Sequence, residues 1–190
     1  MADGDATDPL SAGGFADWLA GMERALRGEG ESQVPCDGCT ACCKSSQFVH
    51  VEPDETEALA RIPTELLFPA PRMPRGHVVL GYDEHGHCPM LVDGMCSIYE
   101  HRPRTCRTYD CRVFPAAGVE PDEEQISIAQ RARRWRFDFP AEVDVVKHDA
   151  VRAAAQFVRD RKELLAEADV PTNATQHAVL AIRMHDAFLT

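Results

Sequence analysis

Apolar residues recur at helical spacing close to the N-terminus. Phe15, Leu19, Met22 and Leu26 lie three or four residues apart, so their side chains fall on one face of a helix. We therefore predict a helix over residues 13–27, which the following glycines end. Residues 1–11 are predicted to be a disordered tail.

The last third of the chain carries two further helical patterns. The first has an apolar face made by Val143, Val146, Ala150, Ala154, Phe157 and Leu164. The second follows a break at Pro171, and its apolar face consists of Ala178, Ile182, His185 and Leu189. A less regular pattern predicts one more helix over residues 122–136. We expect His185, on an apolar face, to be a core histidine.

Two short segments, 47–51 and 77–82, are rich in β-branched and aromatic residues and are predicted to be strands. Between them, Pro53 suits the first turn of a helix over residues 54–61. Four prolines in residues 63–76 predict a covering loop.

These elements predict an α+β fold that is mostly α. Helices from both ends of the chain would brace an irregular, cysteine-rich metal centre that contains the two strands. We expect one domain over residues 12–190, with a metal-binding core at 36–111 and a C-terminal helical part at 122–190.

Charge and hydropathy narrow the possible partners. The net charge of −11 argues against broad binding of nucleic acid, which requires a dense basic surface. No apolar run approaches the roughly 20 residues that span a bilayer, so no membrane partner is expected. The acidic N-terminus lacks the features of a signal peptide, and we expect a cytoplasmic protein with reduced thiols.

Eight cysteines are therefore predicted to bind metal rather than to form disulfides. The first group reads Cys36-Asp-Gly-Cys39-Thr-Ala-Cys42-Cys43, and the second consists of Cys88, Cys96, Cys106 and Cys111. Two residues between cysteines allow both thiolates to face one metal, and Gly38 suits the tight turn that this requires. The three cysteines at successive two-residue spacing and the Cys88-Pro89 pair favour a four-iron iron–sulfur cluster, while zinc or non-sulfide iron remain alternatives.

Adjacent cysteines point to more than one metal. The side chains of Cys42 and Cys43 diverge, so the two are unsuited to one small ion. Two sites are possible arithmetically. One partition gives Cys36, Cys39, Cys42 and Cys88 to a first site, and Cys43, Cys96, Cys106 and Cys111 to a second.

The segment around Cys106 is rich in arginine. Pro103 is suited to begin a helical turn, whose amides would lie near Cys106. These amides and Arg102, Arg104, Arg107 and Arg112 are expected to lower the pKa of the Cys106 thiol. The arginines would neutralise a negatively charged cluster or bind a carboxylate or phosphate.

The cysteine pattern resembles the YkgJ-type cysteine cluster family, described as zinc- or iron-chelating. The resemblance covers residues 36–107, at Cys36, Cys39, Cys42, Cys43, Cys88, Leu91, Gly94, Cys96, Ile98, Tyr99, Arg102, Pro103, Cys106 and Arg107. It implies metal binding, and it leaves Cys111 outside the shared pattern. Flagellin lysine methylases are distantly similar, which would imply modification of a protein or peptide substrate.

The leading hypothesis is therefore a protein that holds an iron–sulfur cluster or iron and supports redox chemistry or protein modification. A zinc-binding structural or interaction module, or a protein of metal chelation and delivery, is the alternative. Tyr99, Arg102 and Arg107 are candidates for contacts around the metal. His85, His87 and His101 lie near cysteines in the sequence and could be metal ligands. Because eight thiols are available, we expect these histidines to be surface or loop residues. No motif names a substrate, so no enzyme activity is assigned.

Overall fold

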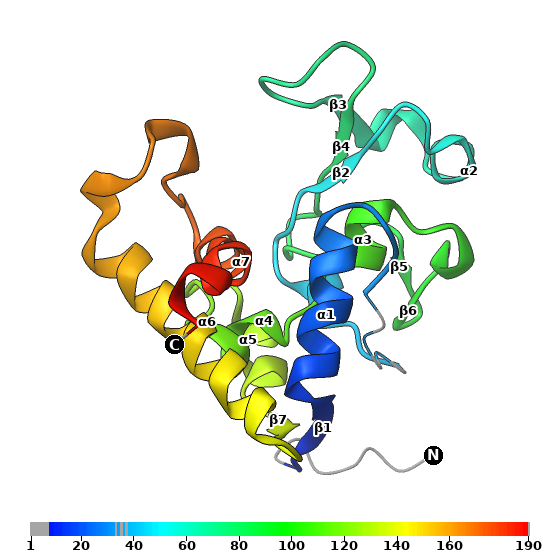
Figure 1. The fold of residues 1–190 in the computed structure, drawn as a ribbon. Helices are drawn as coiled ribbons and strands as arrows, with labels where there is room; N and C mark the ends of the chain where they lie inside the picture. Colours follow the sequence, from blue (N-terminus) through cyan, green and yellow to red (C-terminus); the bar gives the residue numbers. More distant parts are fainter. Residues whose placement is uncertain (1–7, 33, 35, 37, 190) are drawn as a thin grey trace. The chain divides into compact units, whose positions relative to one another are not determined.

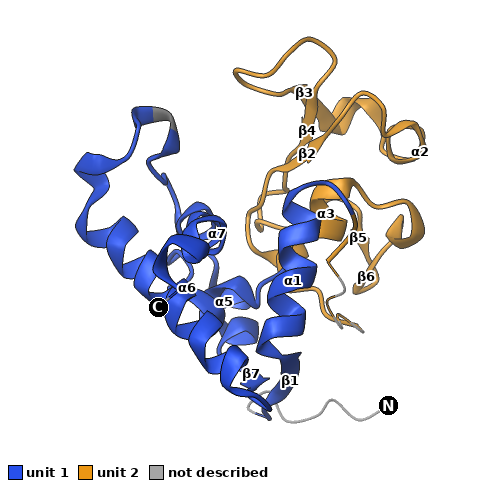
Figure 2. Cartoon of the chain, viewed as in Figure 1, with its two compact units in different colours: residues 1–29, 110–190 blue, residues 30–109 orange. Residues whose placement is uncertain are grey.

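The computed structural model describes residues 8–32, 34, 36 and 38–189, and it has the predicted α+β, mostly α, fold (Figure 1). The chain divides into two compact units (Figure 2). Unit 1 contains residues 1–29 and 110–190, and unit 2 contains residues 30–109. The prediction of one domain therefore stays a prediction, and each unit is described by itself.

Unit 1 is predominantly helical. Its elements are β1 (Leu10–Gly14), α1 (Phe15–Leu26), α4 (Val113–Ala117), α5 (Ile126–Ala132), β7 (Trp135–Asp138), α6 (Glu142–Asp160) and α7 (Ala174–Met184). Three 3-10 segments complete it: η4 (Lys162–Leu164), η5 (Glu167–Asp169) and η6 (His185–Phe188). No described helix is both long and apolar enough to cross a membrane.

The helices of unit 1 bury much of the faces that their apolar spacing predicts, but Val143, Leu164 and Leu189, which were assigned to those faces, are exposed, and the latter two lie beyond the ends of α6 and α7. Phe15 and Leu19 of α1 are inaccessible to solvent, as are Val151 of α6 and Ile182 of α7. The predicted helices over 13–27 and in the last third of the chain are confirmed by α1, α6 and α7.

Strand pairing in unit 1 was not predicted. The helix predicted over 122–136 is right for α5 but wrong at its end, where Trp135 begins β7. Strand β7 pairs in parallel with β1, and Leu10 lies opposite Trp135. A two-stranded parallel pair between segments so far apart leaves no local pattern in the sequence. Strand β1 also includes Leu10 and Ser11, which the sequence assigned to a tail, while residues 1–7 lie outside the described part.

A buried ion pair lies at the start of the second sequence segment of unit 1, which begins at residue 110. Asp110 and Arg112 expose 0% and 8% of their side chains, and Arg112 Nη2 lies 2.7 Å from Asp110 Oδ2. Trp18 Nε1 of α1 donates to the same carboxylate at 2.9 Å. Arg112 Nη1 donates to the carbonyl oxygen of Ala12 in β1 at 3.2 Å. One carboxylate and one guanidinium thus connect β1, α1 and the start of α4.

Unit 2 consists of short elements joined by loops. Its sheet has the order β2 (Val49–Val51), β4 (Val78–Leu80), β3 (Leu67–Pro69), and all pairs are antiparallel. A separate hairpin is formed by β5 (Leu91–Val92) and β6 (Met95–Cys96). The helices are α2 (Thr56–Leu59), α3 (Arg104–Thr108), η1 (Cys42–Lys44), η2 (Thr64–Leu66) and η3 (Tyr99–His101).

The two predicted strands of this unit are confirmed, in shorter form, by β2 and β4. The helix predicted over 54–61 is reduced to the four residues of α2. The loop predicted over 63–76 is wrong in part, because it contains β3. Strand β3 pairs only with β4 and is an edge strand, which is where a sheet tolerates Pro69.

The core of unit 2 is small and lies next to the cysteines. Its buried members are Val49, Val51, Ala58, Ile62, Leu80, Met90 and Ile98. The partly buried Cys88 and Cys96 pack against this cluster. Two of the candidate ligands are therefore positioned by the hydrophobic packing of the unit itself.

Asp144 connects the starts of the two long helices of unit 1. Its side chain is almost fully buried. Oδ1 accepts a hydrogen bond from the Ala16 amide in the first turn of α1 at 2.8 Å. Oδ2 accepts one from the Ala141 amide, just before α6, at 3.0 Å. The carboxylate thus satisfies amides at two helix N-termini, where negative charge is favoured.

Replacing Asp144 by Asn is expected to lower the free energy of unfolding by about 2 kcal/mol, because one buried amide loses its acceptor. Urea unfolding monitored by circular dichroism measures this change. The matched control is Asp149→Asn on the same helix, where the side chain is exposed and little change is expected. Equal effects of the two substitutions would contradict the role given to Asp144.

Candidate metal centre

Seven of the eight cysteines belong to unit 2, and Cys111 belongs to unit 1. The first group lies on a curled loop: the Cys39 amide donates to the Cys36 carbonyl oxygen at 2.7 Å. Gly38 has a φ of +68°, a left-handed conformation that glycine adopts without a steric penalty. The tight turn predicted from Gly38 is therefore confirmed.

Backbone hydrogen bonds join the two cysteine-bearing loops. The Cys88 amide donates to the Cys43 carbonyl oxygen at 2.8 Å, and the Ser46 amide donates to the Gly86 carbonyl oxygen at 2.9 Å. Gly86 has a φ of +76°, and a Cβ there would collide with the Ser46 hydroxyl. The close approach of these loops depends on the absence of a side chain at residue 86.

The β5–β6 hairpin positions the next pair of cysteines. Its turn residues Asp93 and Gly94 both have positive φ values, 49° and 75°, as a type I′ turn requires. Leu91 lies opposite Cys96 in the hairpin, and the Leu91 amide donates to the Cys88 carbonyl oxygen at 2.9 Å. A two-residue turn therefore brings Cys96 back towards Cys88.

Helix α3 presents Cys106, and it is held against β2 and α2. It begins directly after Pro103, as predicted, and the Cys106 amide donates to the Pro103 carbonyl oxygen at 2.8 Å. Thr105 Oγ1 donates to the His50 carbonyl oxygen in β2 at 2.7 Å. The Glu55 carboxylate accepts hydrogen bonds from the Arg104 amide and from the Glu52 amide.

When ionised, four of these thiols repel one another in every pair: Cys43, Cys88, Cys96 and Cys106. Burial raises the pKa of Cys43 to about 11, and repulsion from Cys88 and Cys96 adds to the shift, followed by weaker effects from Cys39 and Cys36. Burial also raises the pKa of Cys88, opposed by the Met90 amide, and repulsion from Cys96 adds to it.

The same holds for Cys106. Although its residue surface is exposed, the protein around the sulfur raises the pKa of Cys106 to about 12. Repulsion from Cys88, Cys43 and Cys96 contributes, and Arg102 acts in the opposite direction. We call Cys43, Cys88, Cys96 and Cys106 the four-thiol set.

The partition considered for the sequence stays a prediction. Cys88 interacts electrostatically with Cys43, Cys96 and Cys106, and Cys43 interacts with Cys36 and Cys39 as well. Cys42 is exposed, whereas the adjacent Cys43 is half-buried.

The four sulfurs are near one another without converging on a point. Among the described residues, no three cysteine sulfurs all lie within 4.8 Å of one another. Four thiolates at about 2.3 Å from a single zinc ion would be about 3.8 Å apart. A four-iron cluster places each thiolate on a different iron atom and keeps the sulfurs farther apart.

The predicted net lowering of the Cys106 pKa is wrong, although Arg102 acts in the predicted direction. The pKa of Cys106 is raised rather than lowered, because burial outweighs the attraction of Arg102. Arg104 is paired with Glu52 at 2.7 Å and Asp54 at 3.2 Å. Arg107 is paired with Glu31 at 3.1 Å, and Arg112 is buried in unit 1. Most of the arginine charge predicted around Cys106 is therefore neutralised by carboxylates.

Tyr99 and Arg102 form a pair at the surface. The guanidinium of Arg102 lies 4.2 Å from the centre of the Tyr99 ring, and Arg102 Nη1 donates to the Tyr99 carbonyl oxygen at 2.8 Å. Half of the Tyr99 surface is exposed. Ile98, next to it, is the residue that packs into the core. Contact of Tyr99, Arg102 and Arg107 with a metal centre stays a prediction.

Cys111 has a different environment from the other cysteines. It is 6% exposed within unit 1, and its Sγ accepts a hydrogen bond from Trp135 Nε1 at 3.2 Å. Its neighbours in sequence are Asp110 and Arg112 of the buried ion pair. A role for Cys111 as a ligand stays a prediction.

The histidines near the cysteines have carboxylate neighbours. His85 lies 3.7 Å from Glu84, and His101 Nδ1 lies 3.8 Å from Glu57 Oε2. The His87 and His85 amides both donate to Asp83 Oδ1, and these hydrogen bonds, that of His87 above all, lower the pKa of Asp83.

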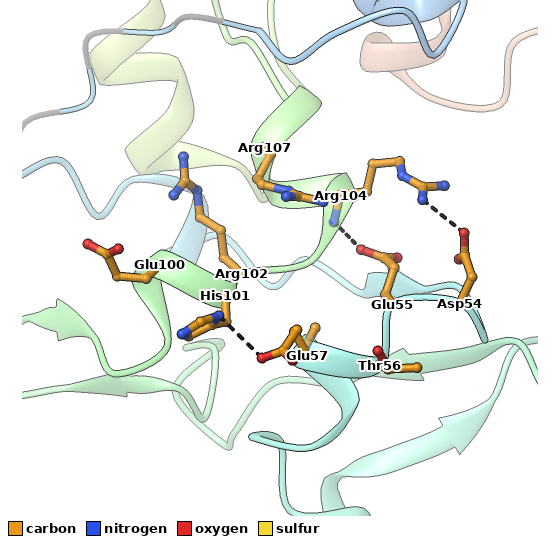
Figure 3. Close-up of a pocket in the computed structure, with 10 residues that line it drawn as sticks. Asp54, Glu55, Thr56, Glu57, Glu100, His101, Arg102, Arg104 and Arg107 are labelled. Carbon is orange, nitrogen blue, oxygen red and sulfur yellow. Dashed lines mark hydrogen bonds and ion pairs between the residues drawn. The ribbon is translucent and has the colours of Figure 1, made fainter.

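A cavity of about 290 Å³ lies between α2 and the η3–α3 segment (Figure 3). It is lined by Asp54, Glu55, Thr56, Glu57, Ala58, Glu100, His101, Arg102, Arg104 and Arg107. Glu57 faces His101, and Asp54 faces Arg104 (Figure 3). Acidic and basic side chains both line the cavity, and binding of an anion by the arginines stays a prediction.

Glu55 is the functional residue that the sequence analysis missed. Only 9% of it is exposed, and its two oxygens serve the Glu52 amide and the Arg104 amide. The spacing Glu52-x-x-Glu55 resembles a capping box, a local signal that was available in the sequence. The second contact joins residues 49 positions apart and leaves no such signal.

A family model described as "CxxCxxCC: Putative zinc- or iron-chelating domain" matches residues 35–132, more than half of the chain. The chain belongs to this family. The match includes all eight cysteines and extends past residue 107 into unit 1. No curated protein and no solved structure shows significant similarity to the chain. Membership supports metal binding through the cysteines, with zinc or iron as the metal.

Replacing Glu55 by Ala is expected to lower the free energy of unfolding of unit 2 by about 2 kcal/mol, because the Arg104 and Glu52 amides lose a shared acceptor. Hydrogen exchange at the amides of α3 measures the loss locally. The control Glu65→Ala removes an exposed carboxylate from the same unit. Unchanged protection of α3 in Glu55→Ala would contradict this role.

Proposed function

We propose that the protein binds a four-iron iron–sulfur cluster through Cys43, Cys88, Cys96 and Cys106. The observation that carries the proposal is the gathering of four thiols whose ionised forms repel one another in all pairs. At neutral pH such a set ionises only when positive charge lies between the sulfurs. Membership in a zinc- or iron-chelating family supports the same conclusion.

The spacing of the sulfurs supports a cluster over a single zinc ion. Sulfurs that are coupled electrostatically but not within 4.8 Å in threes match thiolates on separate iron atoms. A bound cluster would supply reversible one-electron chemistry. The exposed surface of Cys106 and the cavity beside α3 are suited to redox chemistry or to modification of a protein or peptide at this centre.

Replacing any one of the four proposed ligands by Ser is expected to remove most of the bound iron and acid-labile sulfide from protein purified without oxygen. Iron, sulfide and zinc analysis with visible absorption spectroscopy measures this. The matched control is Cys111→Ser, which is expected to keep the full iron content because Cys111 is outside the four-thiol set. A colourless protein with stoichiometric zinc and no sulfide would instead show a zinc module, the alternative function.

The affinity for metal is expected to rise with pH. Without metal, the raised pKa values of Cys43 (about 11) and Cys106 (about 12) keep these thiols protonated at neutral pH, so a binding metal must displace their protons. Zinc titrations in buffers of different ionisation enthalpy count the protons released. We expect more than two per chain at pH 7, and no release would contradict the four-thiol site.

The metal-free protein should respond to pH in the opposite sense. In the unfolded chain the thiols ionise near pH 8.5, whereas in the folded chain they ionise only at higher pH. The unfolded state therefore binds fewer protons between these values, and the free energy of unfolding falls as pH rises above about 8.5. Urea unfolding of the metal-free protein across this range provides the comparison.

A further inference from the structure

A second metal-binding arrangement occurs in unit 1 and involves no cysteine. Glu23 of α1, His185 and Asp186 each place one ligand atom within 4.8 Å of the others. Among the described residues, no other three histidine, cysteine or acidic side chains have ligand atoms that all lie within 4.8 Å of one another. The apolar spacing of the last helix predicted that His185 is a core residue, and only 2% of its surface is exposed. The two carboxylates that face it were not predicted.

The hydrogen bonds of the His185 ring determine which nitrogen is available. Nδ1 lies 2.7 Å from the carbonyl oxygen of Ile182, which can only accept a hydrogen bond, so Nδ1 carries a proton. Metal-binding histidines commonly donate one ring N–H to a backbone carbonyl, which orients the other nitrogen. In His185 this leaves Nε2 as the donor towards a cation.

The Nε2 atom faces a carboxylate oxygen. It lies 3.3 Å from Oδ1 of Asp186, whose side chain is 80% exposed. A nitrogen lone pair and a carboxylate lone pair repel each other at this distance unless a proton or a cation lies between them. Two ligand atoms at about 2.1 Å from one metal in tetrahedral geometry are about 3.4 Å apart, close to the observed separation.

Glu23 lies beside the same imidazole and comes from a different helix. Its Oε1 is 3.8 Å from Nδ1 of His185, the nitrogen bonded to the Ile182 carbonyl, so a rotation of this side chain, which is 28% exposed, would bring the carboxylate to a cation on Nε2. The group is thus reached by solvent at Asp186 and is closed by the buried imidazole at its inner end. One nitrogen and two carboxylates are donors that suit divalent transition metals such as manganese, iron and zinc.

We propose that Glu23, His185 and Asp186 bind a divalent cation, separate from the cysteine centre, with water in the remaining coordination positions. The cation would replace the proton that otherwise must separate Nε2 from Asp186. It would also connect α1 to η6, the last segment before residue 189, and so stabilise the folded state of unit 1 by mass action.

Manganese(II) is the probe that separates this site from the thiols, because it prefers oxygen and nitrogen ligands to thiolates. Full-length protein, purified without oxygen so that its cysteine centre is intact and with no zinc added, is titrated with Mn²⁺, and the electron paramagnetic resonance signal of the free ion is followed. We expect one Mn²⁺ per chain to bind, to raise the melting temperature and to broaden the His185 imidazole resonances.

The Glu23→Gln and Asp186→Asn variants should each weaken Mn²⁺ binding at least about tenfold, the loss seen even when only an outer partner of a metal ligand is removed. Glu124→Gln, which removes an exposed carboxylate from the same unit, is the matched control and should bind as the wild type does. These variants retain the buried imidazole, so a folding defect at His185 does not complicate the test.

Two outcomes would overturn the proposal. Wild-type protein that binds no Mn²⁺ would show that Glu23, His185 and Asp186 do not form a cation site. Binding that is equal in Glu23→Gln, Asp186→Asn and Glu124→Gln would show only general attraction of cations to an acidic protein.

Discussion

The cost of ionising four neighbouring thiols is the constraint on which the cysteine site of unit 2 depends. Cys43, Cys88, Cys96 and Cys106 come from four different segments, and each raises the cost of ionising the others. A small domain whose core holds few large side chains gains little stability from such an arrangement unless a cation compensates it. The short strands and one-turn helices of the unit form a frame that positions the cysteine side chains.

That frame is fixed mainly by backbone groups and carboxylates. The Cys88–Cys43 hydrogen bond, the left-handed turn at Asp93 and Gly94, and the Glu55 contact with the start of α3 each hold one cysteine-bearing segment. The hydrophobic core contributes at Cys88 and Cys96. In unit 1, too, buried carboxylates connect separate elements: Asp110 and Asp144 each accept a hydrogen bond from α1.

The sequence predicts those features that have a local cause. Apolar spacing predicts α1, α6 and α7, and the Cys-x-x-Cys turn follows from Gly38. The β1–β7 pair and strand β3 were missed because their partners are distant or their residues include proline. The pKa of Cys106 was predicted with the wrong sign, since the nearby arginines can be counted in a sequence whereas the burial of the sulfur and its proximity to Cys88, Cys43 and Cys96 cannot.

The interrupted order of unit 1 has a consequence for synthesis of the chain. Residues 30–109 leave the ribosome before the partners of β1 and α1 exist, because β7 and α6 are encoded later. Strand β1 must wait, unpaired, while more than a hundred residues are added. The cysteine-bearing unit is complete first, so capture of its metal can precede closure of the helical unit that flanks it in sequence.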